Sequence, residues 1–415
     1  PMQGGAMEHA TNFAYPQNAI DGGHRYDELW AHELSHSWFG NYVTCWSPDE
    51  MWLNEGWARY SEALYHLAVH GEASFRDYMR SIQYRSVMAS HLADGEYLPL
   101  YPMPPDQTYG STTYDKGATV AHTLRNYIGD GQFFPALQAY FKRHGYSNAT
   151  TYHFMSSFHA AKSDSRMMRF TEAFVYAPGW HQFHLVPNKR TATFNNVTYL
   201  VEDFLSADLI GGKPGLPAVL NIEVLYVGAE PGQVKLERYE LDWTTRRYQG
   251  DFVLRTQLPF EPVYTVIDPY EKIAEGALSH LVQDSSYGQS EALEPAYLNL
   301  RFPSGLPAKS EIGPLNVAFF PHPPEKRLAD NGMRGYWQLQ ALPEATLDVE
   351  FEALRALMPD KMRSGSDGKP KLELHYKPVL EAEWEPVAAE ISGASKPKAR
   401  LKNARPGYYT LVLAE

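Results

Sequence analysis

The pattern of hydrophobic and polar residues changes near residue 190. Before that point, apolar side chains recur every three or four residues, as on one face of a helix. Three such faces are Phe75, Tyr78, Met79 and Ile82; Val120, Leu124, Tyr127 and Ile128; and Phe134, Leu137, Tyr140 and Phe141. We interpret these aromatic faces as core packing rather than as ligand-binding surfaces. The first part of the chain is therefore predicted to be mostly helical.

After residue 190 the period changes to two, which is typical of strands. Leu220, Ile222, Val224 and Tyr226 alternate with Asn221, Glu223 and Leu225. A polar stretch at 283–295 is predicted to be a linker. Beyond it, turn-rich segments such as 364–370 separate further predicted strands, around 298–302, 336–339, 347–351, 372–376 and 408–413. We predict a multidomain α+β protein with a helical domain at 1–186 and β-sandwich-like domains at 187–290 and 291–415.

Length and composition indicate a globular protein. The 415 residues are 44% hydrophobic and 21% charged, which predicts two or three domains and excludes a chain disordered throughout. The formal charge of −12 repels phosphate, so nucleic acid is not an expected partner. The single cysteine, Cys45, allows neither an intramolecular disulfide nor a thiolate cluster. No apolar run reaches the roughly 18 residues expected of a membrane span.

Histidine is concentrated in the first part of the chain, where 13 of the 16 histidines precede residue 186. His32 and His36 lie four residues apart in His-Glu-Leu-Ser-His, so a helix would place both imidazoles on one face, with Glu33 beside them. A catalytic zinc site uses three protein ligands and leaves one position open. Glu55 follows His36 after eighteen intervening residues, in Asn-Glu-Gly on a second predicted helix from Glu50 to about Val69. The sequence therefore predicts one zinc ion per chain, bound by His32, His36 and Glu55.

These residues carry a resemblance to a known family. His32 to His36, followed by Trp-Phe-Gly-Asn at 38–41 and the segment around Glu55, resembles the aminopeptidase N-like zinc metallopeptidases of the gluzincin group. Two further motifs of that family occur in the expected order, Gly-Ala-Met-Glu-His at 5–9 and Tyr-Asp-Lys-Gly at 114–117. The resemblance spans roughly residues 4–180 and implies a thermolysin-like, mostly helical catalytic domain.

The resemblance also implies a role for each motif residue. Glu33 would be the general base, and Tyr114 would stabilise the oxyanion that forms on the peptide carbonyl. Glu8 would pair with the free α-ammonium of the substrate, beside the substrate-binding residues Gly5, Ala6 and Met7. The expected function is zinc-dependent hydrolysis of N-terminal residues from peptides with a free N-terminus.

Some features leave alternatives open. His9 stands where asparagine is usual, which keeps the neighbouring glycyl aminopeptidase family as a second possibility. An endopeptidase built on the same zinc core is a third, and a zinc-binding scaffold without turnover is a fourth; the presence of Glu33 and Tyr114 argues against the scaffold.

Family members carry a β-rich domain before the segment that contains Gly5. We therefore expect this chain to be a fragment of a longer polypeptide or one chain of a processed enzyme, with that domain or a partner chain completing the substrate pocket. The compartment is not indicated by the residues themselves. Similarity to secreted bacterial relatives favours a secreted or periplasmic location over a cytoplasmic one.

Overall fold

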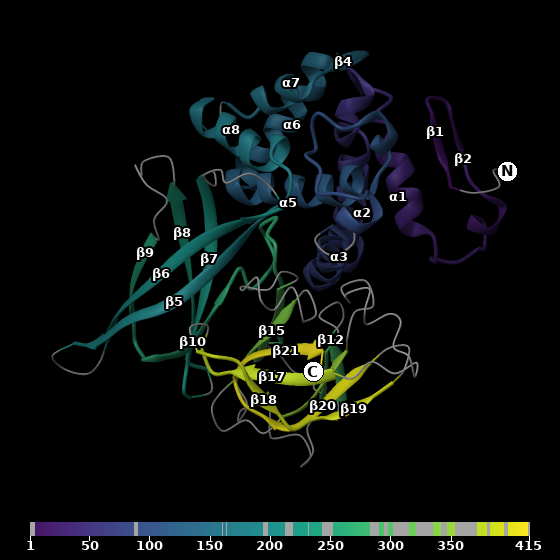
Figure 1. Cartoon of the computed structure of the whole chain (residues 1–415). Helices are drawn as coiled ribbons and strands as arrows, with labels where there is room; N and C mark the ends of the chain where they lie inside the picture. The colour runs from purple at the N-terminus through teal and green to yellow at the C-terminus, as the bar shows by residue number, and fades with distance from the viewer. Residues whose placement is uncertain are drawn as a thin grey trace.

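The computed structural model describes most of the chain, and the account below is confined to those residues. They are 5–86, 90–159, 161–162, 164–193, 198–211, 219–230, 232–242, 252–282, 290–293, 298–301, 315–320, 335–341, 347–352, 372–379, 382–393 and 397–413. Together they form an α+β structure, with helices in the first part and β-sheets in the rest (Figure 1).

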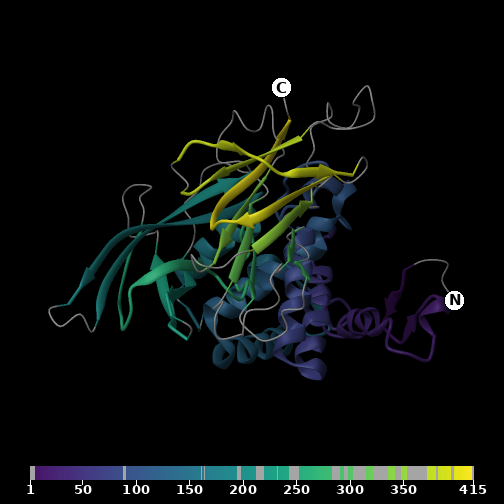
Figure 2. The same cartoon turned by 90° about the horizontal axis from the view of Figure 1, so that it is seen from below.

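The N-terminal part is helical, with a β-hairpin at its edge. Strands β1 (Met7–His9) and β2 (Asn12–Ala14) pair antiparallel, and both views place this hairpin beside α1, away from the sheets (Figures 1 and 2). The helices are α1 (Asp27–Ser35), α2 (Glu55–His70), α3 (Glu72–Tyr84), α4 (Ser90–Ala93), α5 (Gly117–Ile128), α6 (Asp130–His144), α7 (Thr151–Ser156) and α8 (Asp164–Thr171). Shorter 3-10 helices are η1 (Gln17–Ala19), η2 (Pro48–Leu53) and η4 (Pro105–Gln107), and π-helical turns are η5 (Thr112–Lys116) and η6 (Glu172–Tyr176). Strands β3 (Val43–Cys45) and β4 (Ser147–Ala149) pair in parallel. Among the described helices, none is both long and apolar enough to cross a membrane.

The predicted helical faces are confirmed in α3 and α5 and corrected in α6. Phe134, which the sequence analysis assigns to the buried face, is 36% exposed, whereas Phe133 is fully buried. Phe133 stacks on Trp57 with ring centroids 5.9 Å apart. Positions 133, 137 and 140 fit the helical period as well as 134, 137 and 141 do, so the period alone cannot choose between two adjacent phenylalanines.

The first β region packs directly on the helices. One sheet has the order β5 (Trp180–Ala192), β6 (Tyr199–Ile210), β9 (Phe252–Leu258), and the other has the order β10 (Pro262–Ile267), β7 (Val219–Gly228), β8 (Val234–Asp242). Side chains of these strands, such as Leu205 and Val224, belong to the same hydrophobic cluster as Trp57 and Phe170 of the helical part. The predicted boundary at residue 186 lies within β5.

The second β region contains two antiparallel sheets. One has the order β11 (Leu278–Val282), β14 (Leu315–Phe320), β15 (Tyr336–Gln340), β21 (Gly407–Leu413), β17 (Leu372–Lys377), β18 (Glu385–Val387). The other has the order β12 (Ser290–Leu293), β13 (Leu298–Arg301), β16 (Leu347–Glu352), β20 (Lys398–Ala404), β19 (Glu390–Ser392). Both sheets contribute to one hydrophobic cluster, to which Phe319 and Trp337 belong from the first sheet and Phe351 from the second.

The predicted strands of this region are confirmed, but the predicted linker at 283–295 contains strand β12. The rest of that linker and the predicted turn-rich segment at 364–370 lie outside the described residues. Strand β11 precedes the predicted domain boundary at residue 290 and pairs with β14 beyond it. The division into domains 1–186, 187–290 and 291–415 stays a prediction.

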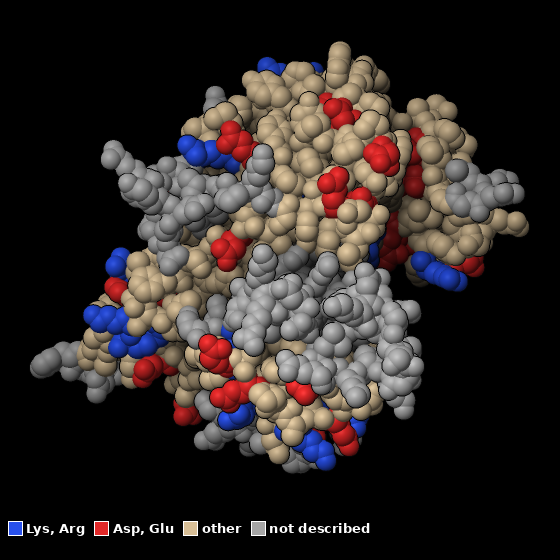
Figure 3. All heavy atoms as spheres, in the orientation of Figure 1, with Lys and Arg blue, Asp and Glu red and all other residues tan. Residues whose placement is uncertain are grey.

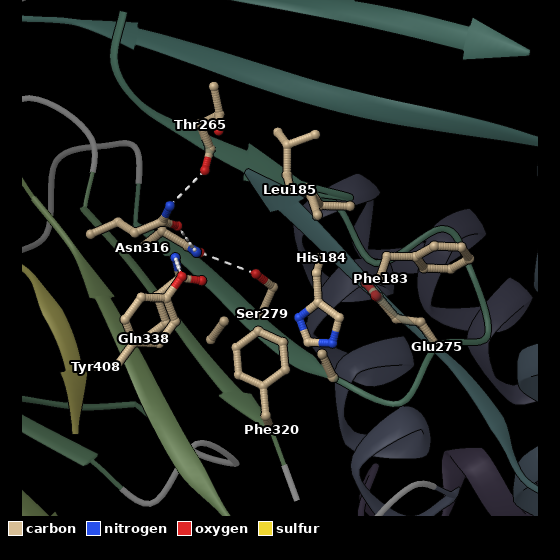
Figure 4. A pocket seen from close by; sticks show the side chains of 14 residues that line it. Phe183, His184, Leu185, Thr265, Glu275, Ser279, Asn316, Phe320, Gln338 and Tyr408 are labelled. Atoms are coloured by element: carbon tan, nitrogen blue, oxygen red, sulfur yellow. Dashed lines mark hydrogen bonds between the residues drawn. The ribbon is translucent and has the colours of Figure 1, made fainter. Parts of the chain in front are cut away.

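Polar side chains join the two β regions (Figure 4). The Gln340 amide of β15 donates to the Thr265 carbonyl of β10 at 2.6 Å, and Asn316 donates to Gln340 at 2.9 Å. His184 of β5 stacks on Phe320 of β14 with ring centroids 5.9 Å apart. The cavity that these residues line is small, with a volume of about 40 Å³. A larger cavity of about 580 Å³ lies beside it at the same junction, between residues such as Leu185, Val263 and Tyr408.

Candidate metal centre and substrate site

Three potential metal ligands converge between α1 and α2. His32 and His36 extend from one face of α1, and Glu55 is the first residue of α2. Glu55 Oε2 lies 3.2 Å from His32 Nε2 and 3.3 Å from His36 Nε2. The three donor atoms all lie within 4.8 Å of one another. The predicted ligands are thus brought together, and a carboxylate oxygen with two imidazole nitrogens is a donor set suited to a divalent cation such as zinc.

The other ring nitrogen of each histidine already has a partner. His36 Nδ1 donates to the Phe39 carbonyl at 2.8 Å, because a carbonyl oxygen can only accept. His32 Nδ1 lies 2.8 Å from Glu62 Oε1, a carboxylate that is itself buried. A proton held on Nδ1 leaves the Nε2 lone pair directed at the shared site, which is the arrangement found in metal-binding histidines.

The electrostatics of this group also suit a cation. Burial lowers the pKa of His32, but the hydrogen bonds that its ring donates to the Glu55 and Glu62 carboxylates outweigh burial and raise that pKa to about 9. Burial raises the pKa of Glu55, but its contacts with His32 and His36 outweigh it and hold that pKa at about 2. The anionic carboxylates therefore favour the protonated form of the His32 imidazole near neutral pH, and contact with Glu55 also raises the pKa of His36 against the effect of its burial. A divalent cation binding here would displace those protons.

Glu33 lies beside these ligands without being one of them. Its side chain is buried, and its Oε2 has no hydrogen-bond partner among the described residues. Burial raises the pKa of the Glu33 carboxyl, an effect that the nearby His32 and His36 partly oppose. A buried carboxylate oxygen without a partner is costly unless a ligand or water occupies the space in front of it. Glu33 is thus placed to accept a proton inside the site.

The N-terminal hairpin brings Glu8 to the same place. Carboxylate oxygens of Glu8 and Glu33 and a ring nitrogen of His36 lie within 4.8 Å of one another. The Asn41 side chain donates to the Glu8 carbonyl at 2.7 Å and so joins the hairpin to the loop that follows α1. Gly5 has a φ of 67°, in the region that favours glycine, and Ala6 and Met7 continue into β1. Figure 3 shows acidic side chains along the hollow between the hairpin and the helices.

Tyr114 reaches the site from η5. Its ring lies over the His32 ring at a centroid distance of 6.1 Å and an angle of 21° between the planes. Burial and the charge of Glu55 raise the pKa of the Tyr114 phenol. The phenol therefore stays protonated at neutral pH and can donate a hydrogen bond.

Two motif glycines set the distance between the helices that carry Glu55 and Tyr114. Gly56 follows Glu55 in α2, and Gly117 begins α5 directly after η5. A Cβ atom added to Gly56 would lie 2.8 Å from the Gly117 Cα, closer than side chains pack. The two backbones touch here because neither residue has a side chain. This contact gives a structural reason for glycine at both positions, one residue after Glu55 and three residues after Tyr114.

Replacing Gly56 with alanine is expected to lower the free energy of unfolding by about 1–3 kcal/mol, because the added methyl group would overpack the contact with Gly117. Chemical denaturation would measure this change. The matched control is Gly131→Ala in α6, where an added Cβ meets no atom within 4 Å. That variant is expected to be as stable as the wild type or slightly more stable, since alanine favours a helix over glycine. Equal stability of the Gly56→Ala and Gly131→Ala variants would contradict the close contact.

The sequence analysis missed several residues that adjoin the site. Glu62, the partner of His32, lies seven residues after Glu55 and hence on the same face of α2, a signal that helical spacing contains. Tyr15 and Tyr109 also face the site: burial together with the charge of Glu33 raises the pKa of Tyr15, and burial together with Glu55 and Glu8 does so for Tyr109. No spacing pattern points to these two tyrosines, because the folded chain alone brings them near.

The first part of the chain is similar to a known protein family. Residues 4–174 match the peptidase family M1 domain. Leucine aminopeptidase 2 of Coccidioides immitis is 32% identical over 189 residues, which cover 42% of this chain and 30% of that protein. Aminopeptidase N of Streptomyces lividans is 27% identical over 230 residues, which cover 54% of this chain and 25% of that protein. The chain thus spans about 30% of the length of the leucine aminopeptidases that it matches.

Solved structures give a weaker similarity. A crystal structure of an M1 zinc metallopeptidase from Deinococcus radiodurans superimposes with a TM-score of 0.37 and 22% sequence identity. The aligned part covers 42% of this chain and 37% of the other.

Proposed function

Because residues 4–174 belong to peptidase family M1, we propose that this chain carries the catalytic domain of a zinc-dependent aminopeptidase. The whole protein would remove N-terminal residues from peptides, as the names of the leucine aminopeptidases and of aminopeptidase N say of those relatives. One observation carries the proposal. A carboxylate oxygen of Glu55 and the Nε2 atoms of His32 and His36 converge, and the unpartnered Oε2 of Glu33 lies nearby.

We propose that His32, His36 and Glu55 hold one zinc ion. When bound, zinc supplies Lewis acidity, which polarises the scissile carbonyl and makes a water molecule more acidic. Glu33 accepts the proton of that water at its free Oε2 and later passes it to the leaving amine. Tyr114 donates a hydrogen bond to the carbonyl oxygen as negative charge develops there, so it stabilises the transition state more than the ground state.

Glu8 accounts for the preference for an N-terminus in this proposal. Its carboxylate lies close to Glu33 and His36, near the position that the first peptide bond would occupy. A charge-assisted hydrogen bond from a substrate ammonium to Glu8 would place the scissile carbonyl one residue from the chain end. Gly5, Ala6 and Met7 would lie along the substrate backbone, where the missing Cβ of Gly5 allows a close approach.

Replacing Glu8 with alanine is expected to lower kcat/KM for a peptide with a free N-terminus by roughly 10- to 100-fold, the range expected for losing a hydrogen bond between charged groups. Its slow rate on the matching N-acetylated peptide is expected to stay unchanged. Steady-state kinetics on the two peptides measures the difference. An equal loss on both peptides would favour an endopeptidase with the same metal centre.

We also propose roles for the domains that contain and adjoin the metal centre. Residues up to about 186 would form a thermolysin-like catalytic domain, and the two β regions would be accessory β-sandwich-like domains.

The outer face of α1 and the loop after it expose Trp30, Leu34 and Trp38 at a spacing of four residues. We propose that a β-rich N-terminal domain of the longer polypeptide covers this apolar face. Hydroxyl-radical footprinting of that polypeptide should then modify Trp30 and Trp38 less than in this chain; equal modification would contradict the docking.

A further inference from the structure

A partly buried arginine joins the two elements that bring the proposed catalytic groups to the site. Arg59 lies one turn after Glu55 in α2, and its side chain is 19% exposed. Its Nε donates to Asp115 Oδ1 at 3.1 Å, and its Nη1 donates to the Glu62 carboxylate. Nη1 also lies 3.1 Å from the Tyr78 hydroxyl of α3. One guanidinium thus links a carboxylate of its own helix to a carboxylate of η5.

Each carboxylate that Arg59 binds adjoins a residue of the proposed mechanism. Glu62 holds His32 Nδ1 at 2.8 Å. Asp115 directly follows Tyr114 in η5, and it is buried. One ion-pair partner of Arg59, Glu62, therefore contacts the proposed zinc ligand His32. The other, Asp115, is the chain neighbour of the proposed oxyanion donor Tyr114.

The backbone around Tyr114 is anchored within η5, a single π-helical turn that leads directly into α5. Such turns are rare and occur mostly in continuity with an α-helix. Ser111 Oγ donates to Asp115 Oδ2 at 3.2 Å, and Arg85 Nε reaches Asp115 Oδ1 at 3.3 Å. On the other side of the turn, Lys116 Nζ donates to the Leu98 and Ala177 carbonyls at 3.2 and 3.0 Å. The two residues that directly follow Tyr114, Asp115 and Lys116, are therefore both held through their side chains.

We infer that Arg59 is a positioning residue that acts through Asp115 on Tyr114 and through Glu62 on His32, and so holds the oxyanion donor in place against the metal ligands. This inference rests on the proposed function. Arg59 does not contact the reacting atoms. Its planar fork of donors can bind two carboxylates at once, whereas the ammonium of lysine is a single compact charge.

Arg59→Lys tests the inference while keeping a positive charge between Glu62 and Asp115. We expect kcat to fall by roughly tenfold with KM within about twofold and one zinc per chain, because a misplaced catalytic group lowers the rate without removing substrate contacts. The matched control is Arg85→Lys, the same exchange at the other arginine on Asp115 Oδ1, whose side chain is 38% exposed. It should change kcat by less than about threefold. An equal effect of both exchanges would contradict the inference.

A double-variant comparison shows where Arg59 acts. If Arg59 acts mainly by placing Tyr114, then Arg59→Lys should lower kcat by less than about twofold when Tyr114→Phe is already present. The same tenfold loss in both backgrounds would show that Arg59 acts elsewhere.

Crystal structures of the wild type and of Arg59→Lys supply a readout that needs no turnover. The Tyr114 hydroxyl should move by about 1 Å or more relative to Glu55, the scale on which misplacement costs activity. An unmoved Tyr114 would overturn the inference. If the wild type hydrolyses no peptide, the proposed function fails, and this structural comparison still decides the role of Arg59.

Discussion

Replacing Glu33 with glutamine is expected to lower kcat by about 10²- to 10⁴-fold, the range expected for loss of a general base. Glutamine has nearly the same shape as glutamate but cannot accept the proton. The zinc content should remain one per chain, because Glu33 is not among the three converging ligands. Steady-state kinetics together with metal analysis of the purified variant measures both quantities.

The matched control for this variant is Glu28→Gln on the same helix. Glu28 Oε1 pairs with His66 Nε2 at 3.2 Å, and its side chain is 36% exposed. Neither residue belongs to the metal centre, so kcat should remain within about twofold of the wild type. If Glu33→Gln kept a third or more of the wild-type kcat while binding zinc normally, Glu33 would not be the base.

Tyr114→Phe is expected to lower kcat by about 10²- to 10³-fold, the range expected for removing one oxyanion donor. The change deletes a single hydroxyl group and leaves the ring over His32 in place. KM should change little, because the lost hydrogen bond forms mainly in the transition state. Kinetics at saturating and at low peptide concentration separate the two constants.

Tyr109→Phe discriminates between the two tyrosines of the site. Tyr109 is 66% exposed and lies near enough to Glu55 and Glu8 for their charges to help raise its pKa. We expect this variant to lose less than about fivefold in kcat. A larger loss in Tyr109→Phe than in Tyr114→Phe would make Tyr109 the oxyanion donor.

Local spacing made the convergence of His32, His36 and Glu55 predictable from the sequence. His32 and His36 need only one helix to share a face, and their pairing with Glu55 follows from a fixed number of residues between two helices. Glu62 could have been found in the same way, because it is two turns from Glu55. Arg59 carries no comparable signal. The positioning role inferred for Arg59 depends on its hydrogen bond to Asp115, which lies on a different element and becomes a neighbour only in the folded chain.

The same distinction applies to the fold. Periodicity predicted helices such as α3 and α5 and strands such as β7 and β15, because each of these elements has a clear pattern in its own residues. The shared core between the helices and strands such as β6 was not predictable, since Leu205 and Trp57 are brought together by tertiary packing alone. Strand β12 within the predicted linker was missed for a related reason. Its residues Ser290 to Leu293 form a strand through pairing with β13 rather than through a strong local pattern.

The most direct test of the proposed function is the cleavage of two matched peptides, one with a free N-terminus and one acetylated, by the zinc-loaded chain and by its Glu33→Gln variant. We expect cleavage of the free peptide one residue from its N-terminus, at a rate far above that of the acetylated peptide, and loss of that cleavage in the variant. Equal cleavage of both peptides, or no cleavage of either by a longer polypeptide that contains this chain and holds one zinc ion, would contradict the proposal.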